Sequence, residues 1–286
     1  MRLTFELTQK CNMNCVYCNA EKSDESCQSL EVIEQVCKEF SEKDKIDYIA
    51  LTGGESLLYK DFGEAVDLVS KYTEHILILT NGLLLNDERV LQVIKKYNVE
   101  IHVSVDSIHS DYHDRVRGHR DKILNNIQQI KNEVHVPIAL VCVLSRYNVS
   151  EIRDINVYCK ENGFNLEFEL LNIDNSSELS IEKLTPKEIQ RVVEDLEEWA
   201  NDFNNHVKYR LLKVVLQNRN FTPSVCYGCK NNYIVFADGN VGPCFLNKSL
   251  MYGNVRDKDF FLTAVEKNKR NYDGACFSYK CLGNYL

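Results

Sequence analysis

The sequence lacks the features that mark membrane, secreted and low-complexity proteins. Its 286 residues include only four prolines and twelve glycines, and no segment is biased toward a few residue types. No run of about 18 apolar residues is present, which argues against a helix that crosses a membrane. The chain starts without an apolar leader, because Met1 to Phe5 runs directly into a strand-like segment. We therefore expect a cytoplasmic protein in a reducing compartment, without a disulfide framework.

The charge of the chain is acidic overall. It carries 34 basic and 42 acidic side chains, which gives a formal net charge of −8. Negative charge repels nucleic-acid phosphates, so we expect no nucleic-acid partner. The length allows one large α/β domain with a small addition.

Short β-rich segments alternate with amphipathic helical segments through about the first 165 residues. Six strands are expected, at residues 3–7, 48–52, 76–80, 101–105, 138–144 and 166–171. Asn86 is expected to cap a helix that begins at Asp87, and Ser150 is expected to open a helix that ends near Gly163. Six consecutive β-α units predict a parallel sheet with right-handed crossovers.

The positions of polar and glycine residues favour one form of this sheet. Each expected strand is followed by a polar or glycine-rich junction, whereas the opposite connections carry no comparable residues. In a β/α barrel the junctions after the strands meet at one rim, where active sites are built. The sequence therefore predicts an α/β fold with a partial (β/α)6 TIM barrel. A flat, doubly wound sheet with a ligand crevice is the alternative.

Three cysteines lie in the first of these junctions, as Cys11, Cys15 and Cys18 in a C-x3-C-x2-C arrangement. A four-iron cluster normally takes four cysteine thiolates, so three ligands leave one iron open. The first histidine is His75, so no nearby histidine completes the set. A structural zinc site needs four ligands, and Cys27 is the one nearby candidate for the fourth. The open iron of a cluster favours a catalytic role.

These residues, together with Gly53-Gly54-Glu55 after the second strand, resemble the radical S-adenosylmethionine superfamily. Tyr17, the aromatic residue just before the third cysteine, is part of the same signature. The resemblance implies a [4Fe-4S] cluster on the three cysteines and S-adenosylmethionine bound to its open iron. It also implies reductive cleavage to a 5′-deoxyadenosyl radical that removes hydrogen from a C–H bond, with the hard chemistry supplied by the cofactor.

The resemblance also assigns residues to cofactor binding. The glycine pair allows a close backbone approach, and Glu55 is expected to accept a hydrogen bond from the cofactor ammonium group. The alternative for Arg117 is a solvated position on the surface, because Arg115 and Arg120 lie close to it in the chain and runs of charge usually face water. The complete cofactor-binding set is Tyr17, Gly53, Gly54, Glu55, Thr80, Asn81, Ser104, Asp106, Arg117 and Leu144.

Two further residues are candidates for roles in the reaction. Glu167 and Glu169 share one face of the sixth strand, so Glu169, near the rim, is a candidate substrate or proton-handling group if that face is inward. Cys142 is a candidate hydrogen donor if it faces the rim. The other cysteines outside the two cysteine groups are expected to be buried or free thiols.

The end of the chain carries a second cysteine group. Thr185-Pro186-Lys187-Glu188 begins a helical stretch that runs to about Gln217, and Asp238-Gly239 predicts a hairpin. We expect a barrel at residues 1–175, a helical linker at 176–221 and a small domain at 222–286. The last domain resembles the SPASM/twitch domain, which implies one auxiliary [4Fe-4S] cluster, whereas a zinc ribbon is the alternative. Its candidate metal ligands are Cys226, Cys229, Cys244, Cys276 and Cys281.

Modification of a peptide or protein side chain is the activity that the subfamily resemblance favours. The alternatives are a dehydrogenase of a sugar or aminocyclitol alcohol, a nucleotide cyclase of the molybdopterin type, and a noncatalytic metal-binding protein. A flavodoxin or ferredoxin is the expected electron donor. The first strand begins at about residue 3, so leader-peptide recognition is expected to need a separate protein, or the substrate is a small molecule.

Overall fold

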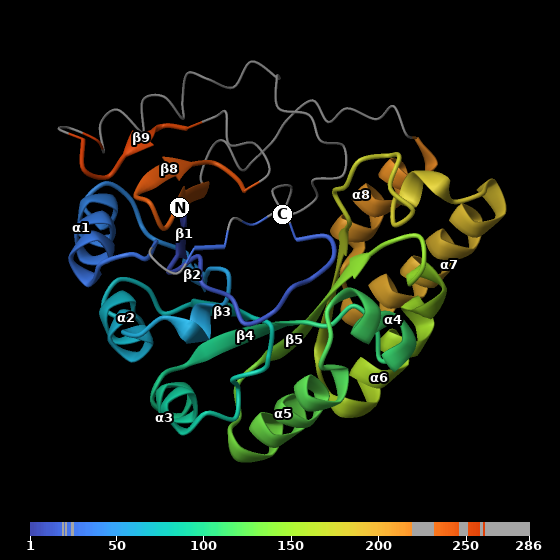
Figure 1. The fold of residues 1–286 in the computed structure, drawn as a ribbon, viewed down its shortest axis with the longest axis horizontal. Helices are drawn as coiled ribbons and strands as arrows, with labels where there is room; N and C mark the ends of the chain where they lie inside the picture. The colour runs from blue at the N-terminus through green and yellow to red at the C-terminus, as the bar shows by residue number, and fades with distance from the viewer. Residues whose placement is uncertain are drawn as a thin grey trace.

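A parallel sheet in chain order forms the centre of the protein (Figure 1). We analysed a computed structural model, which describes residues 1–18, 20, 22–23, 26–218, 232–245, 251–257 and 260. The six parallel strands are β1 (Arg2–Glu6), β2 (Tyr48–Thr52), β3 (Ile76–Thr80), β4 (Val99–Ser104), β5 (Ile138–Leu144) and β6 (Asn165–Leu170). Each strand pairs with the next strand along the chain.

The unbroken strand order identifies the fold as a partial barrel. A doubly wound sheet reverses its strand order at a switch point, which places helices on both faces. Here the order from β1 to β6 never reverses, and the helices follow the outside of the curved sheet (Figure 1). These helices are α1 (Leu30–Ser41), α2 (Phe62–Val69), α3 (Glu88–Lys96), α4 (Ser110–Val116), α5 (Arg120–Glu133), α6 (Ile152–Asn162), α7 (Pro186–Phe203) and α8 (His206–Gln217). Short 3-10 turns lie at Ser56–Leu58, Val149–Glu151 and Ile181–Lys183.

The two faces of the sheet have opposite chemistry. Successive residues of a strand point to opposite faces, and on β6 Leu166, Phe168 and Leu170 are buried while Glu167 and Glu169 are partly exposed. Phe168 packs edge-on against Trp199 of α7, with ring centroids 5.2 Å apart. On β6 the apolar face therefore lies against the helices, and the face with the two glutamates lines the interior of the barrel.

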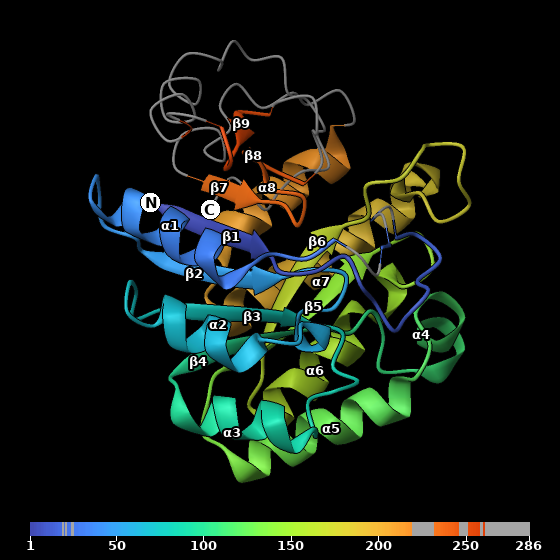
Figure 2. The ribbon, with the colours of Figure 1, turned by 60° about the vertical axis from the view of Figure 1, so that its left-hand side comes forward.

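A C-terminal hairpin extends the sheet beyond β1. β7 (Asn232–Val235) pairs with β1 in parallel, and β8 (Asn240–Gly242) and β9 (Gly253–Asn254) follow in antiparallel order (Figure 2). Gly239 has φ +86°, a left-handed conformation that glycine adopts without strain. The predicted hairpin at Asp238-Gly239 is confirmed. Glu6 also accepts a hydrogen bond from the Ala237 amide at 2.9 Å, which fixes the hairpin to β1.

Several predicted helix ends are confirmed and others shift slightly. Thr185 and Glu188 form the expected capping box, and Gly163 ends α6 in the left-handed region. The cap of α3 is Asp87 and not Asn86, because the Asp87 carboxylate accepts the Arg89 amide hydrogen. Ser150 lies within a 3-10 turn, one turn before α6 proper.

Trp199 provides a test of the packing between the sheet and its helices. Its side chain is fully buried, and its indole nitrogen donates to the Leu166 carbonyl at 3.0 Å. Trp199→Ala should lower the free energy of unfolding by about 3–5 kcal/mol because it leaves a large cavity. Trp199→Phe should cost about 1–2 kcal/mol, chiefly through the lost hydrogen bond. Chemical denaturation followed by circular dichroism measures both, and a loss below about 1 kcal/mol for the alanine variant would contradict this packing.

Candidate active site at the rim and in the barrel interior

The three cysteines lie on a loop that follows β1 and is held by its neighbours. Cys11 and Cys15 are partly buried, Cys18 is exposed, and all three are free thiols. The Val16 amide donates to the Val116 carbonyl at the end of α4, at 2.9 Å. The loop therefore crosses the rim from β1 to α4 (Figure 2).

The glycine pair after β2 lets the chain pack directly against the start of this loop. The Gly54 amide donates to the Thr8 carbonyl at 2.8 Å. A Cβ atom at Gly53 would lie 2.5 Å from the Thr8 carbonyl oxygen, and one at Gly54 would lie 2.6 Å from the carbonyl oxygens of Gln9 and Lys10. Real Cβ contacts are never this short, so both positions require glycine. The pair thus supports the cysteine loop itself, a role that the sequence had not revealed.

Glu55 connects the second and third junctions. Its carboxylate accepts hydrogen bonds from the Thr80 hydroxyl at 2.6 Å, the Asn81 amide at 2.7 Å and the Leu57 amide at 3.1 Å. Burial raises the pKa of Glu55, and these three hydrogen bonds oppose the rise. The Asn81 side chain also donates to Asn12 in the cysteine loop, at 2.8 Å. The structure therefore brings together Glu55, Thr80 and Asn81 beside the loop.

A buried ion pair connects the fourth junction to the same loop. The Arg117 Nε atom lies 2.7 Å from Asp106 Oδ2, with side-chain exposures of 10% and 0%. Asp106 also accepts hydrogen bonds from the Val143 amide at 3.0 Å and from the Tyr17 hydroxyl. The Arg117 side chain is thus buried and not a solvated surface group. Its Nη1 atom lies 3.9 Å from the Cys15 sulfur.

The charges around the loop act on its thiols. Burial raises the pKa of Cys15, and the Arg117 guanidinium opposes this rise. Burial also raises the pKa of Cys11, which a hydrogen bond at Met13 and the Lys22 ammonium oppose. Cations beside a thiol favour its thiolate form, which is the form that binds metals.

The donor set fits an iron-sulfur cluster by its chemistry. Three free thiols on one short loop are soft ligands that suit iron-sulfur clusters or zinc. Within the described ranges, no three side chains of cysteine, histidine, aspartate or glutamate are already close enough together to hold a metal ion.

Two of the sequence candidates face the helices and not the barrel interior. Cys142 pairs in register with Phe168, and Leu144 pairs with Leu170, so all four side chains lie on the outer, apolar face. Cys142 is buried, and its thiol donates to the Asp106 carbonyl at 3.4 Å. The hypothesis of a rim-facing hydrogen donor at Cys142 is therefore wrong. Leu144 belongs to the core beneath the rim.

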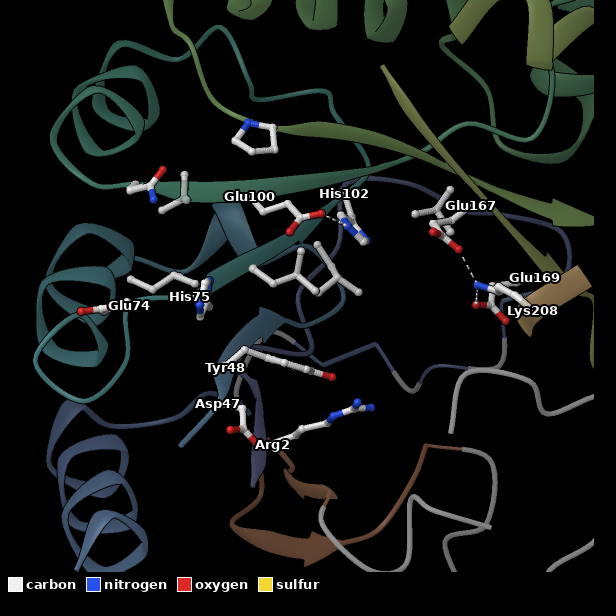
Figure 3. Close-up of a pocket in the computed structure, with 17 residues that line it drawn as sticks. Arg2, Asp47, Tyr48, Glu74, His75, Glu100, His102, Glu167, Glu169 and Lys208 are labelled. Carbon is white, nitrogen blue, oxygen red and sulfur yellow. Dashed lines mark hydrogen bonds and ion pairs between the residues drawn. The ribbon is translucent and has the colours of Figure 1, made fainter. Parts of the chain in front are cut away.

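The polar face of the barrel encloses a cavity of about 690 Å³ (Figure 3). Glu169 and Glu167 point into it, so the face that the sequence left undefined is the inner one. Lys208 of α8 lies between them, 2.7 Å from Glu169 Oε1 and 2.8 Å from Glu167 Oε2. Ser104 shares the inner face of β4 with Glu100 and His102 and lies closer to the rim. No local pattern predicted Lys208, because it lies about forty residues beyond its partners along the chain.

The charged side chains of the cavity lining are mainly acidic. Its carboxylates are Asp47, Glu74, Glu100, Glu167 and Glu169, and its cations are Arg2 and Lys208. Burial lowers the pKa of Lys208, but Glu169 and Glu167 together outweigh burial, so the net shift is upward and the ammonium stays charged. A hydrogen bond with His102 at 2.8 Å lowers the pKa of Glu100, which keeps that carboxylate ionised.

The second cysteine group is described only in part. Cys244, just after β8, is buried with 6% exposure. Cys226, Cys229, Cys276 and Cys281 lie outside the described residues. The predicted auxiliary cluster therefore stays a prediction.

Comparison with known proteins identifies relatives of this chain. Residues 5–156 match the family model described as Radical SAM superfamily. The sporulation killing factor maturation protein SkfB of Bacillus subtilis is 26% identical over 253 residues, which cover 85% of this chain and 60% of SkfB. The GTP 3′,8-cyclase of Clostridium perfringens strain 13 is 29% identical over 278 residues, which cover 90% of this chain and 83% of the cyclase. The chain thus spans less than two thirds of SkfB.

A solved structure supports the fold. The structure of native anSMEcpe with bound AdoMet superimposes with a TM-score of 0.71 at 22% identity, covering 94% of this chain and 81% of that chain. At this identity the likeness concerns the fold alone.

The glycine pair yields a prediction about cluster binding. Gly53→Ala should displace the Thr8 carbonyl and with it the cysteine loop, so iron retained after anaerobic reconstitution should fall several-fold. Gly63→Ala is the matched control, because its Cβ would meet only the Val93 side chain, at 3.3 Å, in a helix. Iron analysis of the purified variants measures the effect. Equal iron content in the two variants would show that the close backbone approach at Gly53 is dispensable.

The Asp106–Arg117 pair yields a prediction about stability. Arg117→Met leaves a buried carboxylate without its cation and should cost about 3–5 kcal/mol in the free energy of unfolding. A double-mutant cycle with Asp106→Asn should give a coupling energy of about 1–3 kcal/mol.

The exposed pair Lys160–Asp202, also 2.7 Å apart, is the control for this cycle. It should couple by less than about 1 kcal/mol. Similar coupling energies in the two cycles would rule out a special role for the buried pair.

Proposed function

The chain belongs to the radical S-adenosylmethionine superfamily of enzymes, and on this premise we propose that it removes a hydrogen atom from a side chain of a peptide or protein substrate. The similarity to SkfB over 85% of this chain supports this assignment, since SkfB is named as the maturation protein of the sporulation killing factor. The dehydrogenase alternative gains no support from SkfB or the cyclase.

The residues of the rim define how the cofactors are held. When bound, a [4Fe-4S] cluster and S-adenosylmethionine together supply a 5′-deoxyadenosyl radical. Cys11, Cys15 and Cys18 hold the cluster, and Arg117 beside Cys15 favours the thiolate that binding requires. Glu55 is fixed by three hydrogen bonds, so its carboxylate is already oriented before a cationic amino group arrives.

The C-terminal region completes the proposal. We assign residues 1–175 to the barrel, 176–221 to a helical linker and 222–286 to a twitch-like domain. Its auxiliary [4Fe-4S] cluster would be held by Cys226, Cys229, Cys244 and either Cys276 or Cys281. A flavodoxin or ferredoxin is the proposed electron donor, and a separate protein is proposed to present the leader of the peptide substrate.

The cellular setting follows from the thiols. Seven cysteines of the described residues are free thiols, which suits a reducing compartment; they are Cys11, Cys15, Cys18, Cys27, Cys37, Cys142 and Cys159. Helices in the described ranges are all too short or too polar to span a bilayer. We therefore propose a cytoplasmic enzyme.

Cyclisation of a purine nucleotide is the second candidate, because the GTP 3′,8-cyclase matches 90% of this chain. The peptide assignment is preferred because SkfB and the mycofactocin maturase MftC are both named for maturation.

Anaerobic reconstitution tests the proposed activity. The wild-type protein should hold about eight irons per chain, four for each of two clusters. With dithionite as reductant it should convert S-adenosylmethionine to 5′-deoxyadenosine, which liquid chromatography detects. Replacing Cys11, Cys15 and Cys18 together by alanine should abolish this product and leave about four irons in the auxiliary cluster.

The buried thiols on the outer face provide controls for this experiment. Cys37→Ala and Cys159→Ala remove fully buried cysteines of helices α1 and α6 that are not among the proposed ligands. Both variants should keep the full iron content and the product. Bound zinc in place of iron, with no cleavage of S-adenosylmethionine, would overturn the proposed function.

A further inference from the structure

The end of α4 contacts the part of the cysteine loop that lies between its second and third cysteines. The Arg117 Nη1 atom lies 3.9 Å from the Cys15 sulfur, within reach of an N–H to sulfur hydrogen bond. The guanidinium carbon lies 5.4 Å from the centroid of the Tyr17 ring. One residue earlier, the Val116 carbonyl accepts the Val16 amide hydrogen at 2.9 Å. A cation is therefore held directly against a sulfur that is a proposed cluster ligand.

The position of this cation is fixed by a buried hydrogen-bond network. Asp106 lies 2.7 Å from the Arg117 Nε atom, and the side-chain exposures are 0% and 10%. The Asp106 carbonyl accepts a hydrogen bond from the Asn148 side chain at 2.8 Å. Asn148 is itself 1% exposed, donates to the Val143 carbonyl at 3.0 Å and accepts from the Ser145 amide at 2.7 Å. The carboxylate that orients Arg117 is thus anchored to the end of β5.

A second cation beside the loop lies in a different environment. The Lys22 ammonium donates to the Met13 carbonyl at 2.6 Å and to the Asn14 side chain at 2.7 Å, and the lysine is exposed. Water and salt screen an exposed charge, whereas a buried charge is screened much less. Of these two cations, Arg117 should therefore have the greater electrostatic effect on the loop.

We propose that Arg117 raises the reduction potential of the cluster held by Cys11, Cys15 and Cys18, by placing a buried positive charge and an N–H donor at the Cys15 sulfur. This inference rests on the proposed function and concerns how that site takes up its electron. Reduction transfers one electron from the donor to the cluster, which changes from [4Fe-4S]²⁺ to [4Fe-4S]⁺ and gains one negative charge. Hydrogen bonds to the ligand sulfurs and the net charge of the site both set such a potential. Arg117 therefore stabilises the reduced form.

A redox titration with dithionite, followed by electron paramagnetic resonance, tests this role. It is carried out without S-adenosylmethionine, so that binding of this cofactor does not enter. Every protein in the series carries Cys226→Ala and Cys229→Ala, so that one cluster dominates the spectrum. Arg117→Met should lower the equilibrium constant for reduction at least about tenfold, which corresponds to about 59 mV for a one-electron couple. Arg153→Met is the matched control, because Arg153 of α6 pairs through Nε with a buried carboxylate of α7, Asp195, at 2.6 Å. Its potential should be unchanged.

Two further variants keep the test decisive if Arg117→Met holds too little iron. Asp106→Asn removes the negative charge of the pair and should raise the equilibrium constant severalfold. Arg117→Lys keeps the positive charge and should lower the constant less than methionine does. General damage to the rim would act in the same direction in the Asp106 and Arg117 variants, whereas the proposal requires opposite directions. Thermal denaturation of each variant identifies such damage.

The outcomes separate this inference from the proposed function. An Arg117→Met potential equal to or above that of the unsubstituted background, in a protein whose wild type cleaves S-adenosylmethionine, would overturn the role of Arg117 alone. A lower potential in Asp106→Asn, with an unchanged denaturation midpoint, would overturn it as well. The expected potentials in a protein that never cleaves S-adenosylmethionine would overturn the proposed function and leave the role of Arg117 standing.

Discussion

The buried ion pair between Asp106 and Arg117 is the interaction on which the rim depends. Asp106 follows β4, and Arg117 lies at the end of α4. The Asp106 carboxylate also accepts hydrogen bonds from the Val143 amide of β5 and from the hydroxyl of Tyr17. One carboxylate thus connects two strands, one helix and the cysteine loop. Burying such a pair is costly unless its geometry is good and its remaining lone pairs are satisfied. Here Asp106 meets both conditions, and Arg117 also reaches the Cys15 thiol.

The two faces of the barrel sheet have different roles, because the outer face packs against the helices and the inner face carries charged side chains. The outer face of each strand is apolar and packs under the helices, as Phe168 does against Trp199. The inner face carries paired charges, such as Lys208 with Glu167 and Glu169. A partial barrel leaves this inner face open to a ligand, whereas a closed eight-stranded barrel fills it with side chains. The same alternation therefore builds both the core and the interior cavity.

The sequence predicted the strands well, because their signals are local. β2, β3 and β5 have the predicted bounds, since each is a short apolar run next to polar residues. Glu55, Thr80 and Asn81 also lie together as expected, because parallel strands end at one rim. Helix caps were harder to predict: Asn86 and Asp87 are adjacent residues of equal capping ability, and the Asp87 carboxylate is the one that accepts the Arg89 amide hydrogen.

Residues that depend on distant partners could not be predicted from the sequence. Arg117 has charged neighbours in the chain and appeared equally suited to the surface, yet it is buried by a pairing with Asp106. Cys142 faces the helices because of its register with Phe168, which a strand pattern alone does not fix. Lys208 was missed for the same reason, since only the packing of α8 brings it into the barrel.

The central claim is that Cys11, Cys15 and Cys18 hold a cluster with one iron open to S-adenosylmethionine. Electron paramagnetic resonance of the reduced, reconstituted protein tests it most directly, in a variant that lacks Cys226 and Cys229 so that one cluster dominates the spectrum. Addition of S-adenosylmethionine should change the g-values of the signal, because a ligand to iron alters the electronic structure of the cluster. Identical spectra with and without S-adenosylmethionine would contradict the claim.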